Sequence, residues 1–201
     1  MEKLALDQID ILLIDPDRAV RSTIRNILID NGFRNVTVGT GLADIREKFQ
    51  LSMPDLLISD INLPDGSFSD FVYSLRHHEI GNNPFLPVIA TAWSPTADNV
   101  RGVVQSGADH IVAKPLSSDQ LLQRIMVMIK ARKPFVVTSA YIGPDRRKPG
   151  EDAKRGEFIE QVQVPNVLKS KAMSGGRANI GQIQREIDAC SQKINLQKLD
   201  R

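Results

Sequence analysis

Five short apolar runs, each followed by a stretch with helical periodicity, constrain the fold of this chain more than any other feature. The runs lie at residues 9–14, 35–38, 56–58, 86–91 and 109–113. The run at Leu56–Ile58 has the length and the unbroken apolar character of a strand that is buried on both faces of a parallel sheet. Between them apolar residues recur at helical spacing, as in Val20, Ile24, Ile27 and Leu28. The alternation predicts a parallel sheet with five helices on its two faces.

Capping residues indicate where these helices begin and end. Asp17 is expected to cap the first helix and Asn31-Gly32 to end it. Ser94 followed by Pro95 predicts the start of the fourth helix, and Ser117 the start of the fifth. The expected helices therefore follow their strands after short connections, at about residues 17–31, 42–53, 67–76, 94–107 and 117–130.

Polar residues follow four of the five apolar runs, where each strand leaves the core. They are Asp15, Asp60, Thr91 and Lys114. The carboxyl ends of parallel strands meet at one edge of an open sheet, where such folds place their ligands. Two carboxylates at one place repel each other and need a cation, and oxygen-only ligands suit Mg²⁺. Together with a lysine and a hydroxyl, they form the set of groups needed for phosphoryl transfer onto a carboxylate.

Residues 9–132 resemble the receiver domain of bacterial two-component response regulators, the CheY-like domains. The resemblance is carried by Leu12–Asp17, Asp60 with Leu63–Gly66, Ala90–Ala92, Gly107–Asp109 and Lys114-Pro115. It implies a flavodoxin-like fold with a five-stranded parallel sheet in the order 2-1-3-4-5. It also implies a phosphorelay signalling protein of the cytoplasm that is not a metabolic enzyme.

The resemblance further implies a role for each residue at the strand ends. Asp60 would accept a phosphoryl group from a partner histidine kinase or phosphotransfer protein. Thr91 and Lys114 would contact that group, and Lys114-Pro115 would be a cis peptide. The implied ligands of Mg²⁺ are Asp15, Asp17, Asp60 and the backbone carbonyl of Asn62.

Two positions depart from the family pattern. The family usually has two adjacent acids after the first strand, and here the second of them is Pro16, which offers no ligand. Either Asp17 replaces it or water does, so we expect phosphorylation to be retained with weaker Mg²⁺ binding. Ile111 stands where the family commonly has an aromatic ring that turns inward on activation. The switch is therefore expected to differ in form on the face of the fourth helix, fifth strand and fifth helix.

The last third of the chain is not explained by the resemblance. We expect a receiver domain over residues 1–133, an irregular basic linker over 134–176, and an amphipathic helix over 177–201. Phe135–Val137 could add a short strand, and Ser174–Gly176 is expected to be a flexible joint. Tyr141–Arg147 is similar to a tail of some stand-alone alphaproteobacterial receivers. The apolar seam of the final helix consists of Ile180, Ile183, Ile187, Cys190 and Ile194, and it fits either a partner helix or the chain's own domain.

Partners are only partly indicated. The fifth expected helix is apolar nearly all round, which predicts that a second receiver or the chain's own tail covers it. A homodimer through the face of the fourth helix, fifth strand and fifth helix, or through the C-terminal helix, is therefore expected alongside an unknown downstream protein. No paired helices of a DNA-reading unit are recognisable, so no DNA is expected. The single Cys190, the absence of a long apolar span and the absence of a signal-peptide pattern favour a cytoplasmic protein away from membranes.

Two other functions fit parts of the pattern. A degenerate receiver would act as a phosphate-independent binding module, which Pro16 and Ile111 favour but Asp60, Thr91 and Lys114 oppose. A haloacid-dehalogenase-type phosphatase would use an Asp-x-Asp motif, as Asp15-Pro16-Asp17 reads. That hypothesis leaves Asp60 without a role, and no downstream acidic pair is recognisable to hold its metal.

Overall fold

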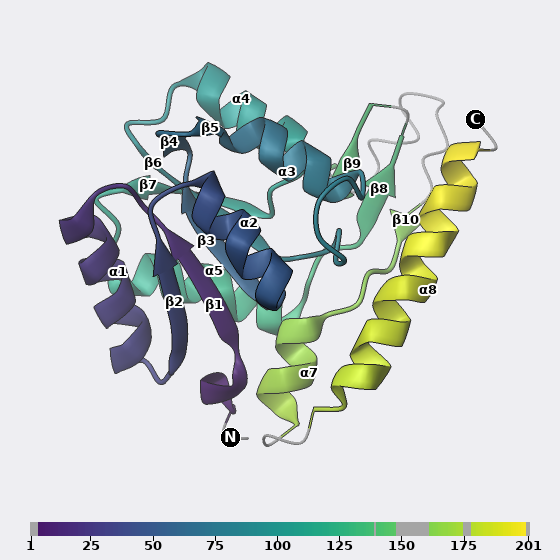
Figure 1. The fold of residues 1–201 in the computed structure, drawn as a ribbon, viewed down its shortest axis with the longest axis horizontal. Coiled ribbons are helices and arrows are strands. Elements are labelled where there is room, and N and C mark those ends of the chain that lie inside the picture. Colours follow the sequence, from purple (N-terminus) through teal and green to yellow (C-terminus); the bar gives the residue numbers. More distant parts are fainter. Residues whose placement is uncertain (1–3, 139, 148–160, 175–177, 200–201) are drawn as a thin grey trace.

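A parallel sheet of five strands forms the centre of the computed structural model, which describes residues 4–138, 140–147, 161–174 and 178–199 (Figure 1). The strands are β1 (Asp10–Ile14), β2 (Asn35–Gly39), β3 (Leu56–Asp60), β6 (Val88–Trp93) and β7 (His110–Lys114). Their order is β2-β1-β3-β6-β7, with every neighbouring pair parallel. The flavodoxin-like fold and its strand order are confirmed.

Five helices cover the sheet: α1 (Arg18–Asp30), α2 (Leu42–Leu51), α3 (Phe68–Arg76), α4 (Ala97–Ser106) and α5 (Ser118–Lys130). Alternate side chains of β1 enter two separate cores. Ile11 and Leu13 pack in a core with α1 and α5, whereas Leu12 and Ile14 pack in a core with α2, α3 and α4. Both faces of the sheet are therefore buried at its central strands, which explains why β1 and β3 are mostly apolar, whereas the edge strand β2 is largely exposed.

Most of the expected helix caps are present. The carboxylate of Asp17 accepts from the N–H groups of Ala19 at 2.7 Å and Val20 at 3.1 Å, and Gly107 ends α4 at a φ of 92°. The start predicted at Ser94 is wrong, because β6 continues to Trp93 and the chain then turns through Ser94 at a φ of 40°. Thr96 caps α4 instead. A small hairpin of β4 (Asn62–Leu63) and β5 (Gly66–Ser67) precedes α3 and was not expected.

The extension after α5 is folded in its described part. An antiparallel sheet contains β8 (Phe135–Val137), β9 (Ile142–Pro144) and β10 (Gln161–Val162) in the order β10-β8-β9, and α7 (Val167–Met173) and α8 (Ile180–Leu199) follow. The short strand at β8 and the final helix are confirmed. The expectation of an irregular linker over 134–176 is wrong for these strands and α7. Most of the joint expected at Ser174–Gly176 lies outside the described residues, and the domain boundaries at 133 and 176 stay predictions.

The extension packs on the preceding domain. Leu168 and Ala172 of α7 join the core that includes Met128 and Ile129 of α5, and the Asn166 side chain donates to the carbonyl of Met128 at 2.9 Å. The tail therefore covers part of α5.

The seam of α8 closes a third core. Ile183, Ile187 and Ile194 lie there with Phe85 and Phe135. This helix docks on its own chain, with α8 at the edge of the molecule (Figure 1). In the part of the chain that is described, no helix combines the length and apolarity needed to cross a membrane.

Candidate functional site

The four strand-end residues meet at one edge of the sheet, as predicted. Asp60 and Thr91 are direct partners in the register of β3 and β6, and Lys114 is the last residue of β7. Asp15 directly follows β1. All four are buried, with exposed fractions of 1% for Asp15, 3% for Asp60, 1% for Thr91 and 5% for Lys114. Buried polar groups need partners, so their contacts define the site.

Lys114 joins the two carboxylates. Its Nζ donates to Oδ2 of Asp15 and to Oδ2 of Asp60. The Lys114 side chain is only 1% exposed, so this ion pair is largely out of contact with water. A buried carboxylate is stable only with a cation or several hydrogen bonds beside it. Lys114 is that cation in the arrangement seen here.

Backbone N–H groups hold the other oxygen of each carboxylate. Asn62 N–H donates to Oδ1 of Asp60 at 2.5 Å, and Asp17 N–H donates to Oδ1 of Asp15 at 2.9 Å. The tight turn after each strand therefore fixes how its carboxylate points. Both side chains direct their Oδ2 atoms at the same ammonium group.

Thr91 has a hydroxyl that is buried and lacks a hydrogen-bond partner among the described residues. Such unpaired groups are uncommon in folded proteins because they lose hydrogen bonds to water. Thr91 lies next to Asp60 across the β3–β6 pair. The hydroxyl of Thr91 is thus available to donate a hydrogen bond to a group bound covalently to the Asp60 carboxylate.

Asp17 and Pro16 lie outside this buried cluster. Asp17 is exposed, and its hydrogen bonds from Val20 and Ala19 hold the pKa of its carboxyl below the usual value. Pro16 is exposed and contributes only its carbonyl, which accepts from Arg21 at 3.4 Å. In the described ranges, no group of three or more His, Cys, Asp or Glu side chains is placed to hold a metal ion. At the sheet edge, the two carboxylates that lie together are those of Asp15 and Asp60, both paired with Lys114.

The surroundings of Lys114 are aromatic and apolar. The peptide between Lys114 and Pro115 is cis, as expected. Nζ of Lys114 lies 5.9 Å from the ring centroid of Trp93, whose side chain is 52% exposed. A cavity of about 240 Å³ adjoins them, lined by Ala19, Val20, Thr23, Ile24, Trp93, Lys114, Pro115 and Leu116. Ile111 is half-buried against the core of α2, α3 and α4.

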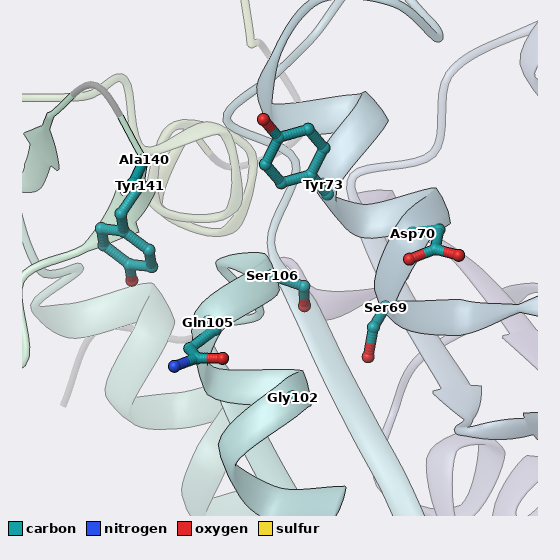
Figure 2. Close-up of a pocket in the computed structure, with 8 residues that line it drawn as sticks. All are labelled: Ser69, Asp70, Tyr73, Gly102, Gln105, Ser106, Ala140 and Tyr141. Carbon is teal, nitrogen blue, oxygen red and sulfur yellow. The ribbon is translucent and has the colours of Figure 1, made fainter.

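A larger cavity lies between α3, α4 and the turn from β8 to β9. It measures about 580 Å³ and is lined by Ser69, Asp70, Tyr73, Gly102, Gln105, Ser106, Ala140 and Tyr141 (Figure 2). None of the strand-end residues lines it. The groups able to transfer a phosphoryl group are therefore at the sheet edge and not in this cavity.

Comparison with known proteins decides the family. The family model of the response regulator receiver domain matches residues 11–126, more than half of the chain. The chain belongs to this family. Receiver domains are signalling modules, and this membership gives no support to the phosphatase hypothesis.

The relatives and solved structures agree with this assignment. The chain is 32% identical to the response regulator Rre1 of Synechocystis over 57% of this chain and 49% of that protein. It is 29% identical to the phosphate regulon transcriptional regulatory protein PhoB of Escherichia coli, over 63% and 54%. A receiver domain of a Pseudomonas aeruginosa sensor histidine kinase, with magnesium coordinated in its active-site cleft, has a TM-score of 0.51 at 24% identity, covering 59% and 94%. The chain thus spans about half the length of the curated relatives it matches.

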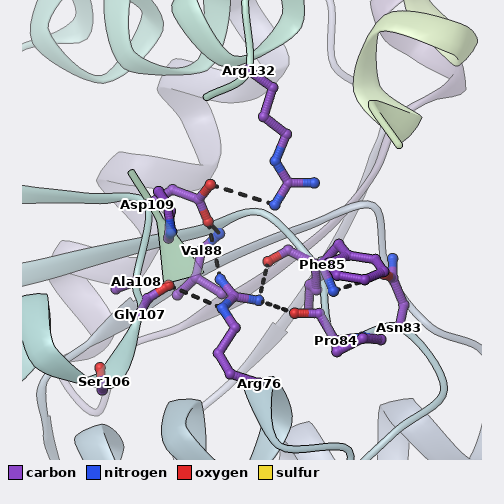
Figure 3. A network of polar contacts seen from close by, with 12 residues as sticks. Arg76, Asn83, Pro84, Phe85, Val88, Ser106, Gly107, Ala108, Asp109 and Arg132 are labelled. Carbon is purple, nitrogen blue, oxygen red and sulfur yellow. Dashed lines mark hydrogen bonds and ion pairs between the residues drawn. The ribbon is translucent and has the colours of Figure 1, made fainter. Parts of the chain in front are cut away.

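One buried polar network in this receiver was not anticipated from the sequence (Figure 3). Arg76 is fully buried at the end of α3 and donates to Asp109 and to three backbone carbonyls. Arg132 donates to the other oxygen of Asp109 at 3.4 Å. Gly107–Asp109 was recognised as a family motif, but nothing in the pattern indicated that a helix arginine would be its buried partner.

Proposed function

We propose that this protein is a phosphoacceptor response regulator whose Asp60 receives a phosphoryl group from a histidine kinase or phosphotransfer protein. It acts in the cytoplasm and signals by contact with a downstream protein. One observation carries the proposal: the buried Asp60 carboxylate is held by Lys114 beside the hydroxyl of Thr91, which has no hydrogen-bond partner among the described residues. A purely structural aspartate would need the cation but not an unpaired hydroxyl beside it.

The geometry supports a specific division of roles in the transfer. An oxygen of the Asp60 carboxylate attacks the phosphorus of the phosphohistidine, so that a P–O bond forms as the P–N bond breaks. The donor imidazole leaves with the electron pair of that bond and takes up a proton. The ammonium of Lys114 balances the charge on the transferring oxygens, and the hydroxyl of Thr91 donates to one of them.

Mg²⁺ fits the same place. The carboxylates of Asp15 and Asp60 would hold it, with the backbone carbonyl of Asn62 as a third oxygen ligand. When bound, the ion would supply positive charge to the phosphoryl oxygens. The carboxylate of Asp17 already accepts two N–H groups of α1, so it would have to leave its capping position to join them.

Intact-mass analysis after incubation with acetyl phosphate and Mg²⁺ tests the proposal. Wild type should gain the mass of one phosphoryl group, which is lost again on mild alkaline treatment, as expected for an acyl phosphate. Asp60→Asn is the matched control and should gain none. An adduct of equal yield on the Asp60→Asn variant, or no adduct on wild type at any Mg²⁺ concentration, would contradict the proposal and favour the phosphate-independent binding module.

Pro16 should set the affinity of the site for Mg²⁺. We expect Pro16→Asp to lower the Mg²⁺ concentration at half-maximal phosphorylation by about tenfold, because it adds a carboxylate at the place where the structure offers none. Pro16→Ala is the control, since it removes the ring and adds no ligand. Equal Mg²⁺ dependence of the two variants would show that Pro16 does not limit metal binding.

The extension supports an output by protein contact. Its described part consists of a small antiparallel sheet and two helices. The apolar residues of α7 pack in the core that includes α5, and those of α8 pack against the small sheet and Phe85. This arrangement leaves no paired helices free to enter a DNA groove among the described residues. We propose that DNA and membranes are not targets, and that the face of α4, β7 and α5, or α8, could pair with a second copy of the chain.

A further inference from the structure

We propose that the C-terminal extension is a clamp on the joint between α4 and β7, residues 107–109, and that phosphorylation of Asp60 loosens this clamp. The inference rests on the proposed function, because it describes how the structure responds when Asp60 is phosphorylated. It assigns a role to Tyr141–Arg147, the segment that the receiver fold itself leaves unexplained.

Backbone contacts form the first part of the clamp. A Cβ atom on Gly107 would lie 2.5 Å from the carbonyl oxygen of Ile142, and one on Gly143 would lie 2.8 Å from Cα of Gly107. Real Cβ atoms do not come so close to a backbone, so the backbones of β9 and the joint are in direct contact, with the hydroxyl of Tyr141 also close to Gly143. Two glycines that face each other allow this approach. Because the two backbones are already in contact, the joint cannot move toward β9 unless β9 moves as well.

Arg146 forms the second part of the clamp. Its guanidinium donates to the carbonyl of Ala108 and, at 3.2 Å, to that of Asp109. Arg146 is exposed, so it contacts the joint from the surface of the protein. The extension thus binds the backbone of the joint directly.

The third part is a buried aromatic contact beneath the joint. The ring of Phe135 in β8 has the guanidinium of Arg76 at 5.2 Å and that of Arg132 at 5.3 Å from its centroid. Both arginines pair with Asp109, the last residue of the joint (Figure 3). The face of an aromatic ring attracts a cation, so each guanidinium is held against Phe135. A movement of Asp109 would therefore disturb the packing of Phe135.

The opposite ends of the same elements lie at the phosphoacceptor site. The chain passes from β6 through α4 and the joint into β7, and β6 and β7 carry Thr91 and Lys114. Only Val103 and Ser106 of α4 are buried, so this helix is held by few core contacts. A phosphoryl group adds charge and acceptor oxygens, for which Thr91 and Lys114 must rearrange. This rearrangement moves β6 and β7 and, through them, α4 and its joint. The clamp opposes that shift of the joint.

Loosening of the clamp should weaken the docking of α8, because β8, β9 and α8 share one hydrophobic core. Val137 of β8 and Ile142 of β9 pack in the same cluster as Ile183 and Ile187 of α8. Cys190 lies in this seam, with its Sγ 3.5 Å from the carbonyl of Gln163. Burial raises the pKa of its thiol, so the docked helix protects it from reaction. As the single cysteine of the chain, it reports on the docking of α8.

The test measures the rate at which Ellman's reagent labels Cys190 in the full chain, with Mg²⁺ and with or without acetyl phosphate, while intact mass records the adduct on the same samples. We expect Cys190 to be labelled at least about fivefold faster in phosphorylated than in unphosphorylated wild type. A factor of about five is at the lower end of the range for allosteric coupling. Asp60→Asn should label at the slow rate in both conditions. Arg146→Ala should label fast in both, and Arg185→Ala, which removes an exposed arginine of α8, should behave as wild type.

The two proposals fail in different ways. An adduct on Asp60 with an unchanged labelling rate would overturn the clamp and leave the phosphoacceptor function standing. No adduct would overturn the function, and the clamp with it. Slow labelling of Arg146→Ala would show that this side chain does not hold the extension. Because linkage between two equilibria is reciprocal, Arg146→Ala should also bind beryllofluoride, a phosphoryl analogue, more tightly than wild type.

Discussion

Arg76→Met is expected to lower the free energy of unfolding by roughly 3–5 kcal/mol, the usual cost of removing one partner of a buried ion pair. Arg76 is fully buried and donates to the carbonyls of Gly107 at 2.9 Å, Pro84 at 2.6 Å and Leu86 at 2.9 Å. It also donates to Asp109 at 3.1 Å. Methionine keeps the apolar stem of the side chain but lacks the guanidinium, so it satisfies none of these acceptors.

The charge of Arg76 adds to this cost. Burial lowers the pKa of its guanidinium to about 10, with Asp109 acting in the opposite direction, so the residue stays charged at neutral pH. Without it, Asp109 keeps only the N–H of Val88 at 2.9 Å and the longer contact from Arg132. The carboxylate is then left in an apolar place with too few donors.

Urea-induced unfolding measures the effect, with Arg101→Met as the matched control. Arg101 is on α4, its side chain is 67% exposed, and its pair with Asp98 at 3.6 Å is a surface one. We expect that control to change stability by less than about 0.5 kcal/mol. A similarly small loss for Arg76→Met would mean that other donors or water satisfy the network, and that it does not hold the joint.

The receiver part of the fold could be predicted because its signals are local. The central strands β1 and β3 are rich in apolar residues, and each helix carries its own periodicity and most of its own caps. The edge where Asp15, Asp60, Thr91 and Lys114 meet follows from the rule that parallel strands end together. Ser94 misled the boundary of α4, because the same dipeptide with Pro95 also fits a turn after an extended strand.

The extension could not be predicted in the same way. Its strands contain two or three residues each, too few for a period to show, and β10 pairs with β8 across a long stretch of chain. Arg76 reads as an ordinary surface residue at a helix end, because its acceptors are brought to it only by the fold. Asp17 could be a cap or a metal ligand by sequence, and only the contacts with Ala19 and Val20 show which role it has in this arrangement.

Lys114→Met is expected to slow phosphorylation of Asp60 by about 10²–10³-fold, the loss seen when one group that stabilises a developing charge is removed. Its effect on Mg²⁺ should have the opposite sign. In the structure Nζ of Lys114 donates to the Oδ2 atoms of both Asp15 and Asp60, the carboxylates that we propose as ligands of the ion. A metal ion must therefore compete with the ammonium group of Lys114 for these two carboxylates, or share them with it.

Removal of the ammonium leaves two buried carboxylates whose Oδ2 atoms have lost their cation, and Mg²⁺ can replace it. The Mg²⁺ concentration at half-saturation should then fall by about tenfold, the effect of roughly 1.4 kcal/mol. Trp93, the single tryptophan of the chain, lies beside Lys114, so its fluorescence can follow the titration. Lys130→Met, which removes an exposed lysine at the end of α5, controls for the loss of charge. A variant that merely misfolds would lose phosphorylation and metal binding together, whereas competition between Lys114 and Mg²⁺ requires the first to fall while the second rises.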